Sequence, residues 1–514
     1  MFDFLKSKKD EEIKTLSRRV SNLSHHIAKL SQARAFDAAR ADRLSADWPT
    51  ISGNPEYDIY AALDVLRTRA RERCQNDGYA KRVVDMFQFN IVGPYGFKLK
   101  SKAVNANDSL DEPGNKAVQD AWMDFAKPIN CSTTARESLT KICTLSIGAL
   151  PRDGEYIIRR VRRKEYKYGI ALQMILPEHL NVRKNERLGN GHIVRMGVEL
   201  DEFDRPCAYW IRKADKEMEL YVTSNYGGEY ERIPAEDIIH NFVADYPNQT
   251  RGIPLLAPGL ITLKNIGGFD EAVLYAARAG ASSMLFLKNQ KNDEPTQYKG
   301  TDKDAEGNTV VSWEPASIQD LGDKELAPFI PEFPNGEHAP FAKIMLRRVA
   351  GSVGVSYEGL ANDRESVNYS SIRAGLIEER ELWKGLQEWF LETTLDRIFG
   401  WWLEEALFKG AIKMQSGTPL PVKVFDKFNN PYFIGKRWDW VDPEKDITAV
   451  GMSIEMGQNS PRRAAAEKGD DFKELIDEIA DDMAYAKLKG VELNFGSKTP
   501  PKQKPNDNNP QVNQ

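Results

Sequence analysis

The residues that could carry chemistry in this chain are few and scattered. Asp153 and Glu155 lie two positions apart, and with His240 they could form an acid/base pair or the metal site of a hydrolase. The sequence of residues 152–155, Arg-Asp-Gly-Glu, also suits a turn that enters a strand, because glycine tolerates reversed backbone. Since no nucleophile or further ligand stands nearby, the turn is the preferred interpretation.

Metal and nucleotide motifs are weak or missing. Residues 302–307 begin like a calcium-binding EF-hand loop, but the twelfth position is Trp313, so a solvated turn is preferred. The six histidines show no H-x-x-x-H spacing, and the sequence has no G-x-x-x-x-G-K-[ST] phosphate loop. We interpret the four cysteines, which lack CxxC spacing, as structural thiols: Cys74, Cys131, Cys143 and Cys207. We expect no cofactor, no metal and no catalytic activity.

Three cations stand out on one short segment. Lys343, Arg347 and Arg348 fall at positions i, i+4 and i+5 of an apolar-periodic stretch, on one side of a helix. Such a stripe could face a nucleic-acid backbone. A solvated face or a salt-bridged face between subunits explains the same pattern equally well.

Composition limits the remaining possibilities. The 514 residues are 41% hydrophobic and 29% charged, which predicts a folded chain of several regions. A net charge of −5 argues against firm binding to phosphates, so any DNA contact should be local and loose. The sequence shows neither an apolar run of about 20 residues nor a signal peptide, and we expect a protein of the cytoplasm without a membrane span.

The elements that must position these residues alternate between helical and strand patterns. A heptad seam from Ile13 to Leu30 predicts an amphipathic helix, and helices follow over residues 60–89 and 116–125. Short β-branched segments between residues 156 and 242 predict antiparallel sheet.

The second half of the chain repeats the alternation. A helix rich in small residues follows Pro258, and strands and turns fill residues 283–337. A short helix from Pro340 then leads to a polar loop over residues 357–369. A long aromatic helix over residues 370–410 and an acidic helix over residues 470–489 precede a disordered tail over residues 497–514.

Several segments, taken in their order and spacing over roughly residues 60–490, resemble the lambda-like family of phage portal proteins. They are residues 152–155 (Arg-Asp-Gly-Glu), 197–201 (Gly-Val-Glu-Leu-Asp), 205–210 (Arg-Pro-Cys-Ala-Tyr-Trp), 233–235 with 239–240, 249–254 (Gln-Thr-Arg-Gly-Ile-Pro), 360–363 (Leu-Ala-Asn-Asp) and 368–375. The resemblance implies an α+β portal fold that assembles into a ring of about twelve subunits around a channel.

The resemblance also implies a division of the chain into named regions. These are an N-terminal helix (1–50), the wing (51–257), the first stem helix (258–282), the clip (283–338), the second stem helix (339–356), the tunnel loop (357–370), a long wing/crown helix (371–412), the crown (413–490) and a disordered tail (491–514). Within it, Lys343, Arg347 and Arg348 become candidates for the channel lining of the stem. The tunnel-loop residues expected near DNA are Asp363, Arg364, Glu365, Ser366, Val367 and Asn368.

The function implied is that of a head-tail connector at the portal vertex of a virion, assembled in the host cytoplasm. Double-stranded DNA would pass transiently and without sequence preference, and the missing phosphate loop leaves the force to the terminase large subunit. Further implied partners are the major capsid and scaffold proteins and a head-completion or tail connector protein. Two alternatives stay open: a capsid-associated structural adaptor without a DNA channel, and the hydrolase built on Asp153, Glu155 and His240.

Overall fold

The computed structural model describes residues 18–22, 53–213, 229–281, 285–289, 302–303, 309–310, 324–328, 338–363, 365, 369–438, 443–468 and 472–491. The chain divides into two units, Met1–Asp58 and Ile59–Gln514. In the first unit residues 18–22 are helical and Val20 is exposed. The rest of the predicted heptad seam and the predicted disordered tail lie outside the described residues.

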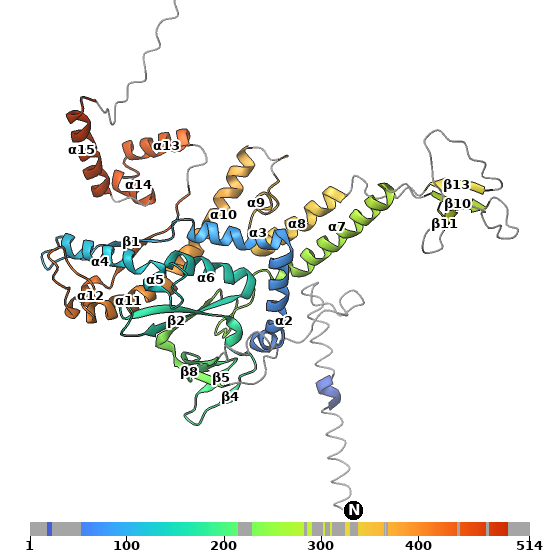
Figure 1. The fold of residues 1–514 in the computed structure, drawn as a ribbon, viewed down its shortest axis with the longest axis horizontal. Coiled ribbons are helices and arrows are strands. Elements are labelled where there is room, and N and C mark those ends of the chain that lie inside the picture. Colours follow the sequence, from blue (N-terminus) through green and yellow to red (C-terminus); the bar gives the residue numbers. More distant parts are fainter. Residues whose placement is uncertain are drawn as a thin grey trace, which may run out of the picture. The chain divides into compact units, whose positions relative to one another are not determined.

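The second unit combines helices with antiparallel sheets (Figure 1), as the α+β prediction requires. Its helices up to the insertion are α2 (Pro55–Asn76, which begins in the first unit), α3 (Gly78–Phe87), α4 (Glu112–Phe125), α5 (Pro128–Cys131), α6 (Leu139–Asp153) and α7 (Leu260–Ala281). The later helices are α8 (His338–Val353), α9 (Tyr357–Ala361), α10 (Tyr369–Phe390), α11 (Asp396–Phe408), α12 (Phe425–Phe428), α13 (Pro443–Glu455), α14 (Pro461–Lys468) and α15 (Phe472–Leu488). Two π-turns, η2 (Gln88–Val92) and η6 (Leu391–Leu395), extend α3 and join α10 to α11, and short 3₁₀ turns are η3 (Pro177–His179), η4 (Ala235–Asp237), η5 (Ala257–Gly259) and η7 (Val422–Val424).

Every pairing between named strands is antiparallel. A three-stranded sheet has the order β3-β2-β9, from β2 (Glu155–Arg162), β3 (Ile170–Ile175) and β9 (Ile238–Phe242). A five-stranded sheet follows the chain order of β4 (Glu186–Arg187), β5 (Ile193–Arg195), β6 (Val198–Leu200), β7 (Pro206–Arg212) and β8 (Tyr230–Pro234). Three further pairs join β1 (Lys98–Ser101) with β14 (Pro431–Ile434), β10 (Leu285–Asn289) with β13 (Lys324–Pro328), and β11 (Asp302–Lys303) with β12 (Thr309–Val310).

The main core lies between α4, α6, the three-stranded sheet and the long helix formed by α10, η6 and α11. Trp122 and Trp402 meet edge to face with ring centroids 5.1 Å apart, and Phe399 and Phe125 pack around them. Aromatic pairs of this geometry each contribute about 0.5–1.5 kcal/mol beyond the area that they bury. The long helix is therefore held mainly by its aromatic side chains, as its sequence predicts.

The four thiols behave as the sequence suggests. Cys74, Cys131 and Cys143 are buried, Cys207 is half-buried, and all four are free. Burial raises the pKa of Cys74 to about 11, which keeps this thiol protonated and unreactive. These cysteines are part of the packing.

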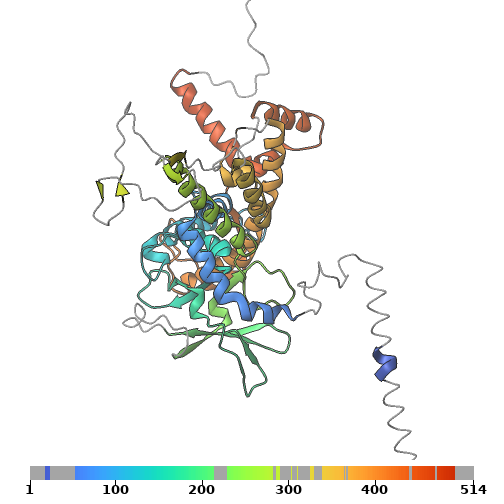
Figure 2. The same cartoon turned by 90° about the vertical axis from the view of Figure 1, so that its right-hand side faces the viewer.

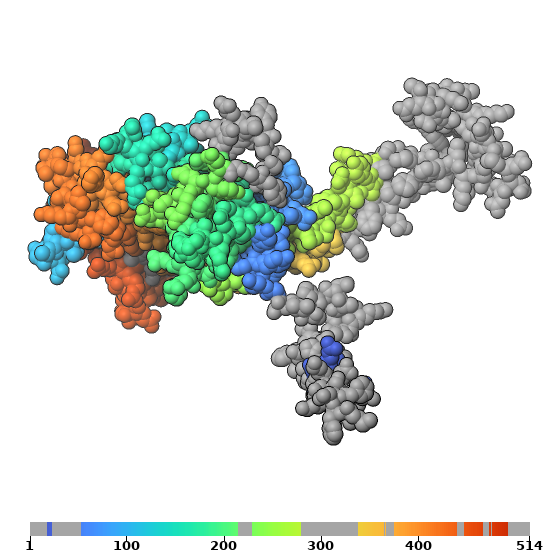
Figure 3. Space-filling model, turned by 90° about the horizontal axis from the view of Figure 1, so that it is seen from below, coloured from blue at the N-terminus to red at the C-terminus, as the bar shows by residue number. Residues whose placement is uncertain are grey.

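Helices α7 and α8 lie side by side and beside α2 (Figures 1–3). Phe269 on α7 stacks on His338 and packs against Phe341 on α8, with centroids 5.3 and 4.9 Å apart. The other faces of the pair leave large apolar side chains exposed: Ile261, Leu274 and Tyr275 on α7, and Phe341 and Ile344 on α8. A two-helix element with this surface has more apolar area than it can cover by itself.

The prediction of a polar loop from residue 357 onward is wrong for its first five residues, which form the one-turn helix α9. Ser356 caps this turn, because its Oγ accepts a hydrogen bond from the backbone N–H of Gly359. Asn362 ends the turn in the left-handed conformation, at φ 53°. Residues 364 and 366–368 of the predicted tunnel loop lie outside the described part of the chain.

Two weak sequence signals are only partly covered. Residues 302–303, the start of the segment that resembles a calcium loop, pair with residues 309–310 in a short ladder. Within the described residues, no helix is both long enough and apolar enough to cross a membrane.

Candidate functional site

The two ends of the hypothetical hydrolase site, Glu155 and His240, do meet, but in a buried ionic cluster. Glu155 is the first residue of β2 and is fully buried. Its carboxylate accepts hydrogen bonds from Arg67 Nη2 at 2.9 Å and from Arg251 Nε at 3.0 Å, and it contacts His240 Nε2 at 3.0 Å. The backbone N–H of Gly252 donates a further bond at 2.9 Å. We call Arg67, Glu155, His240 and Arg251 the Glu155 cluster.

Arg251 joins this cluster to the five-stranded sheet. Its buried guanidinium also donates from Nη1 to the carbonyl oxygens of Leu180 and Met196, at 2.8 and 2.7 Å. Those carbonyls lie in the segments that border the five-stranded sheet. One side chain therefore links the segment after β9, strand β2 and the two segments beside that sheet.

Glycines allow the two motifs of the cluster to approach each other. Gly154 ends α6 in the left-handed conformation at φ 88°, and a Cβ atom there would lie 2.4 Å from the carbonyl carbon of Ile253. A Cβ atom on Gly252 would lie 2.2 Å from the carbonyl oxygen of Gly154. Only residues without a side chain fit this backbone-to-backbone contact.

The charges of the cluster argue for structure and against catalysis. Burial alone would raise the pKa of Glu155, but the attraction of Arg251, Arg67 and His240 outweighs it and holds the pKa well below the ordinary value. Burial also lowers the pKa of His240, so its ring is neutral near pH 7. A carboxylate locked by two guanidinium groups cannot act as a base or bind a metal.

Asp153 points elsewhere. Its carboxylate pairs with Arg71 and, at 2.7 Å, with Arg152 Nη2. No group of three His, Cys, Asp or Glu side chains in the described residues could hold a metal ion. The hydrolase interpretation therefore lacks the cluster that it requires.

Sequence reasoning overlooked Arg67, although a signal for it exists. Arg67 lies on the buried stripe of α2, between Leu63 and Ala70. A charged residue in an apolar stripe needs a buried partner of opposite charge. Arg251 stands in the family-like segment of residues 249–254, where its charge was not matched to Glu155.

The cations of α8 meet the start of the tunnel-loop segment. Lys343 Nζ lies 3.2 Å from Asp363 Oδ2, and the hydroxyl of Tyr357 donates to the same oxygen at 2.9 Å. Lys343 Nζ and Arg347 Cζ each lie 5.4 Å from the centroid of the Tyr357 ring. We call Lys343, Arg347, Tyr357 and Asp363 the Tyr357 cluster.

The base of this cluster is tied to the core. The Oγ of Ser356 donates to Glu379 Oε2 on α10 at 2.6 Å, and Arg82 Nε on α3 donates to the carbonyl of Gly359 at 3.2 Å. The short helix α9 thus has fixed contacts to α3 and α10. These contacts give the Tyr357 cluster a rigid support.

The protonation states follow from the contacts. Burial, and then the hydrogen bond to Asp363, raise the pKa of Tyr357 to about 12, so its hydroxyl keeps its proton. The backbone N–H of Glu365 at 3.1 Å, with Tyr357 and Lys343, lowers the pKa of Asp363, which stays ionised. Two cations therefore face one carboxylate, which leaves one positive charge for an anionic partner.

The structure separates the predicted site residues into two groups. Lys343, Arg347 and Asp363 come together, and Tyr357, which the sequence reasoning did not select, joins them. Arg348 is exposed and takes no part in the cluster. Glu365 contributes its backbone N–H, while residues 364 and 366–368 lie outside the described residues.

Comparisons with known proteins give a consistent result. The chain is 32% identical over 468 residues to a "Probable portal protein" of Halomonas phage phiHAP-1, covering 90% of this chain and 89% of that protein. It is 21% identical to the "Portal protein" of Escherichia phage N15, over 79% of this chain and 82% of that protein. It is 20% identical to "Portal protein B" of Escherichia phage lambda, over 82% and 84%.

Among solved structures, similar chains come from gene transfer agent particles. A chain in the virion of the native particle has a TM-score of 0.42 at 11% identity, covering 80% of this chain and 93% of that one. A chain in the neck of the native particle, computed with C12 symmetry, has a TM-score of 0.40, also at 11% identity and with the same coverage. The family model described as "Phage portal protein, lambda family" matches residues 41–387. The chain belongs to the lambda family of phage portal proteins.

Proposed function

We propose that this chain is one subunit of a ring of about twelve copies at the portal vertex of a phage head, with a channel for double-stranded DNA. DNA enters during packaging and leaves during ejection. The ring docks the terminase large subunit, and later a head-completion or tail connector protein. It also contacts the major capsid and scaffold proteins and performs no catalysis of its own.

The proposal extends to the division of labour along the chain. Helices α7 and α8 are the stem, the segment between them is the clip, and the sheets with α2 to α6 are the wing. The segment after α9 is the tunnel loop, and α13 to α15 belong to the crown. Family membership supports this assignment, because the matched region spans all these parts except the crown.

The stem pair supports assembly. Ile261 and Tyr275 on α7 and Ile344 on α8 are exposed on a two-helix element that leaves them open to solvent in a single copy. Further copies of the same chain would cover these side chains, with a gain of roughly 25 cal/mol for each Å² of apolar surface removed from water. Packing of α7 and α8 between neighbouring copies is the simplest way to achieve this burial.

The observation that carries the DNA-channel proposal is the Tyr357 cluster. Lys343 and Arg347 offer cations to a passing phosphate, yet Asp363 balances one of them and Tyr357 covers both with its ring. The remaining attraction is weak and independent of base sequence. A channel requires such contacts, because DNA must be guided without being trapped.

The test is the assembly state of the full-length protein. Native mass measurement and negative-stain images should show rings of about twelve subunits with a central hole as wide as a B-form duplex. A monomer, or a disc without a hole, at every concentration would overturn the proposal and favour a structural adaptor without a channel.

A further inference from the structure

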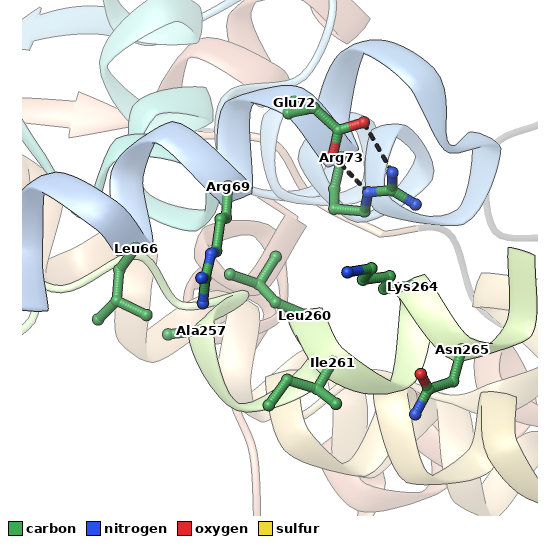
Figure 4. A pocket seen from close by; sticks show the side chains of 9 residues that line it. All are labelled: Leu66, Arg69, Glu72, Arg73, Ala257, Leu260, Ile261, Lys264 and Asn265. Carbon is green, nitrogen blue, oxygen red and sulfur yellow. Dashed lines mark hydrogen bonds and ion pairs between the residues drawn. The ribbon is translucent and has the colours of Figure 1, made fainter. Parts of the chain in front are cut away.

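A pocket between α2 and α7 is outside the sites described so far. It has a volume of about 420 Å³ and combines an apolar floor with a cationic rim (Figure 4). The lining residues are Leu66, Arg69, Glu72 and Arg73 from α2, Ala257 from η5, and Leu260, Ile261, Lys264 and Asn265 from α7. We call it the α2/α7 pocket.

The rim of the pocket favours an acidic occupant. Arg69 reaches from α2 toward Leu260, and Lys264 projects from α7 into the gap between the two helices (Figure 4). Arg73 is bound to its neighbour Glu72, with Nε and Oε2 2.6 Å apart. Three cations thus face a single carboxylate, so an occupant with two carboxylates would balance the rim.

The floor favours an apolar side chain between those carboxylates. Ile261 lines the pocket and is 72% exposed, although it lies on the same stripe of α7 as Lys264, Gly268 and Tyr275. Tyr275 is 62% exposed. Lys264 is the one charged residue among these four, so the stripe suits a covering protein surface better than a DNA backbone.

A segment of this same chain has the complementary chemistry. The turn between β6 and β7 reads Asp201, Glu202, Phe203 and Asp204, and Phe203 at its tip is 80% exposed. One exposed aromatic ring is therefore flanked by acidic residues on both sides. We call these four residues the acidic Phe203 turn.

The turn is held rigid by its own hydrogen bonds. Asp201 Oδ1 accepts from the backbone N–H of Phe203 at 2.8 Å and from that of Arg205 at 2.9 Å. Asp204 adopts a positive φ of 60° and pairs with Arg195 at 3.1 Å. A knob that is already fixed in shape loses little conformational freedom when it docks.

We infer that the α2/α7 pocket receives the acidic Phe203 turn of a second copy of this chain, with Phe203 on the apolar floor and Glu202 toward the Arg69 and Lys264 rim. Charge complementarity supports the match, as do the continuity of the pocket with the exposed stripe of α7 and the high exposure of Phe203. Repeated head to tail, the contact would run around the ring. The inference rests on the proposed function, because it supplies one contact of that ring.

The first test links the two surfaces chemically in the full-length protein. Glu202→Cys and Lys264→Cys are combined in a Cys207→Ser background, because the three remaining native cysteines are buried. Treatment with a short bismaleimide should give a ladder of covalent multimers on denaturing gels. The control pair, Glu202→Cys with Lys116→Cys on the exposed face of α4, should give none.

The second test uses matched apolar positions. Phe203→Asp and Ile261→Asp should each raise the concentration at which rings dissociate by at least about ten-fold, as expected for a central interface residue. Phe408→Asp serves as the control, because Phe408 is also 80% exposed but lies at the end of α11. Its rings should dissociate at the same concentration as those of the unmodified protein.

Both results are required. Intact rings without a ladder, a ladder as strong for the Lys116 pair, or an effect of Phe203→Asp no larger than that of Phe408→Asp would overturn the pocket contact and leave the ring itself standing. Failure of the unmodified protein to form rings would instead overturn the proposed function. A specific ladder in the absence of closed rings would support the contact alone.

Discussion

Lys343 on α8 and Asp363 beyond α9 face each other, with Nζ and Oδ2 3.2 Å apart and Tyr357 bonded to the same carboxylate oxygen. The pair connects the helix that carries the cationic stripe with the segment that the family resemblance assigns to the tunnel loop. Because Asp363 stays ionised, it competes with any phosphate for Lys343. The pair therefore sets how strongly the cluster attracts DNA.

Removing either partner should change DNA binding in opposite directions. Lys343→Gln removes a cation, so the slope of log affinity against log salt should fall by about one for each phosphate that is no longer neutralised. Asp363→Asn leaves Lys343 without its competing carboxylate and should steepen the slope and tighten binding. Binding of a labelled duplex to assembled rings over a salt series measures both effects.

Lys116→Gln on the exposed face of α4 is the control for charge alone. It should leave the salt slope as it is in the unmodified ring. If all three variants shift the slope equally, net charge governs the attraction and the Tyr357 cluster has no special role.

Deletion of residues 363–368 should leave ring formation intact but impair packaging or retention of DNA. The deletion removes Asp363, while α8 and the capped turn α9 keep their contacts with α3 and α10. Ring formation is checked by native mass and DNA content by the filled fraction of heads. Normal packaging after the deletion would refute the tunnel-loop assignment.

The sequence predicted elements well where periodicity is strong. The helix expected after Pro258 is α7, and the aromatic segment expected over residues 370–410 forms α10, η6 and α11. It failed at α9, because one helical turn has no periodicity to detect. The signals for that turn, Ser356 as the cap and Asn362 as the end, are local and short.

Pairing between distant residues could not be predicted in the same way. Arg67 and Glu155 are 88 positions apart, and Glu155 and Arg251 are 96 apart. Local spacing contains no information about which buried cation meets which carboxylate. The acid at position 155 was therefore considered as a catalytic group, although its partners make it structural.

Gly252→Ala should destabilise the protein by about 1–3 kcal/mol, the usual cost of forcing an extra methyl group into a packed site. The added Cβ would lie 2.2 Å from the carbonyl oxygen of Gly154, and backbone atoms cannot move aside easily. Gly189→Ala is the control, since nothing lies within 4 Å of its Cβ position. Thermal unfolding of both variants measures the difference, and equal midpoints would contradict the close approach of the two motifs.

The Glu155 cluster should make stability fall as the pH is lowered. His240 has a folded-state pKa below the ordinary 6.5, because burial disfavours its charged form, so the unfolded chain takes up this proton first. Glu155 has a folded-state pKa well below the ordinary 4.5, because the attraction of Arg251, Arg67 and His240 exceeds the opposing effect of burial. For both groups the stabilisation is present above the ordinary pKa and is lost as the pH falls toward the folded-state pKa.

Two windows follow from these signs. The midpoint of thermal unfolding should fall first below about pH 6.5, through His240, and again below about pH 4.5, through Glu155. Each group contributes a slope of at most about 1.4 kcal/mol per pH unit, the value for one proton. His240→Gln should abolish the first slope and keep the second, while His338→Gln, at the partly exposed start of α8, should keep both. If the His240 variant retains the first slope, the proton is taken up elsewhere and the buried ring does not control it.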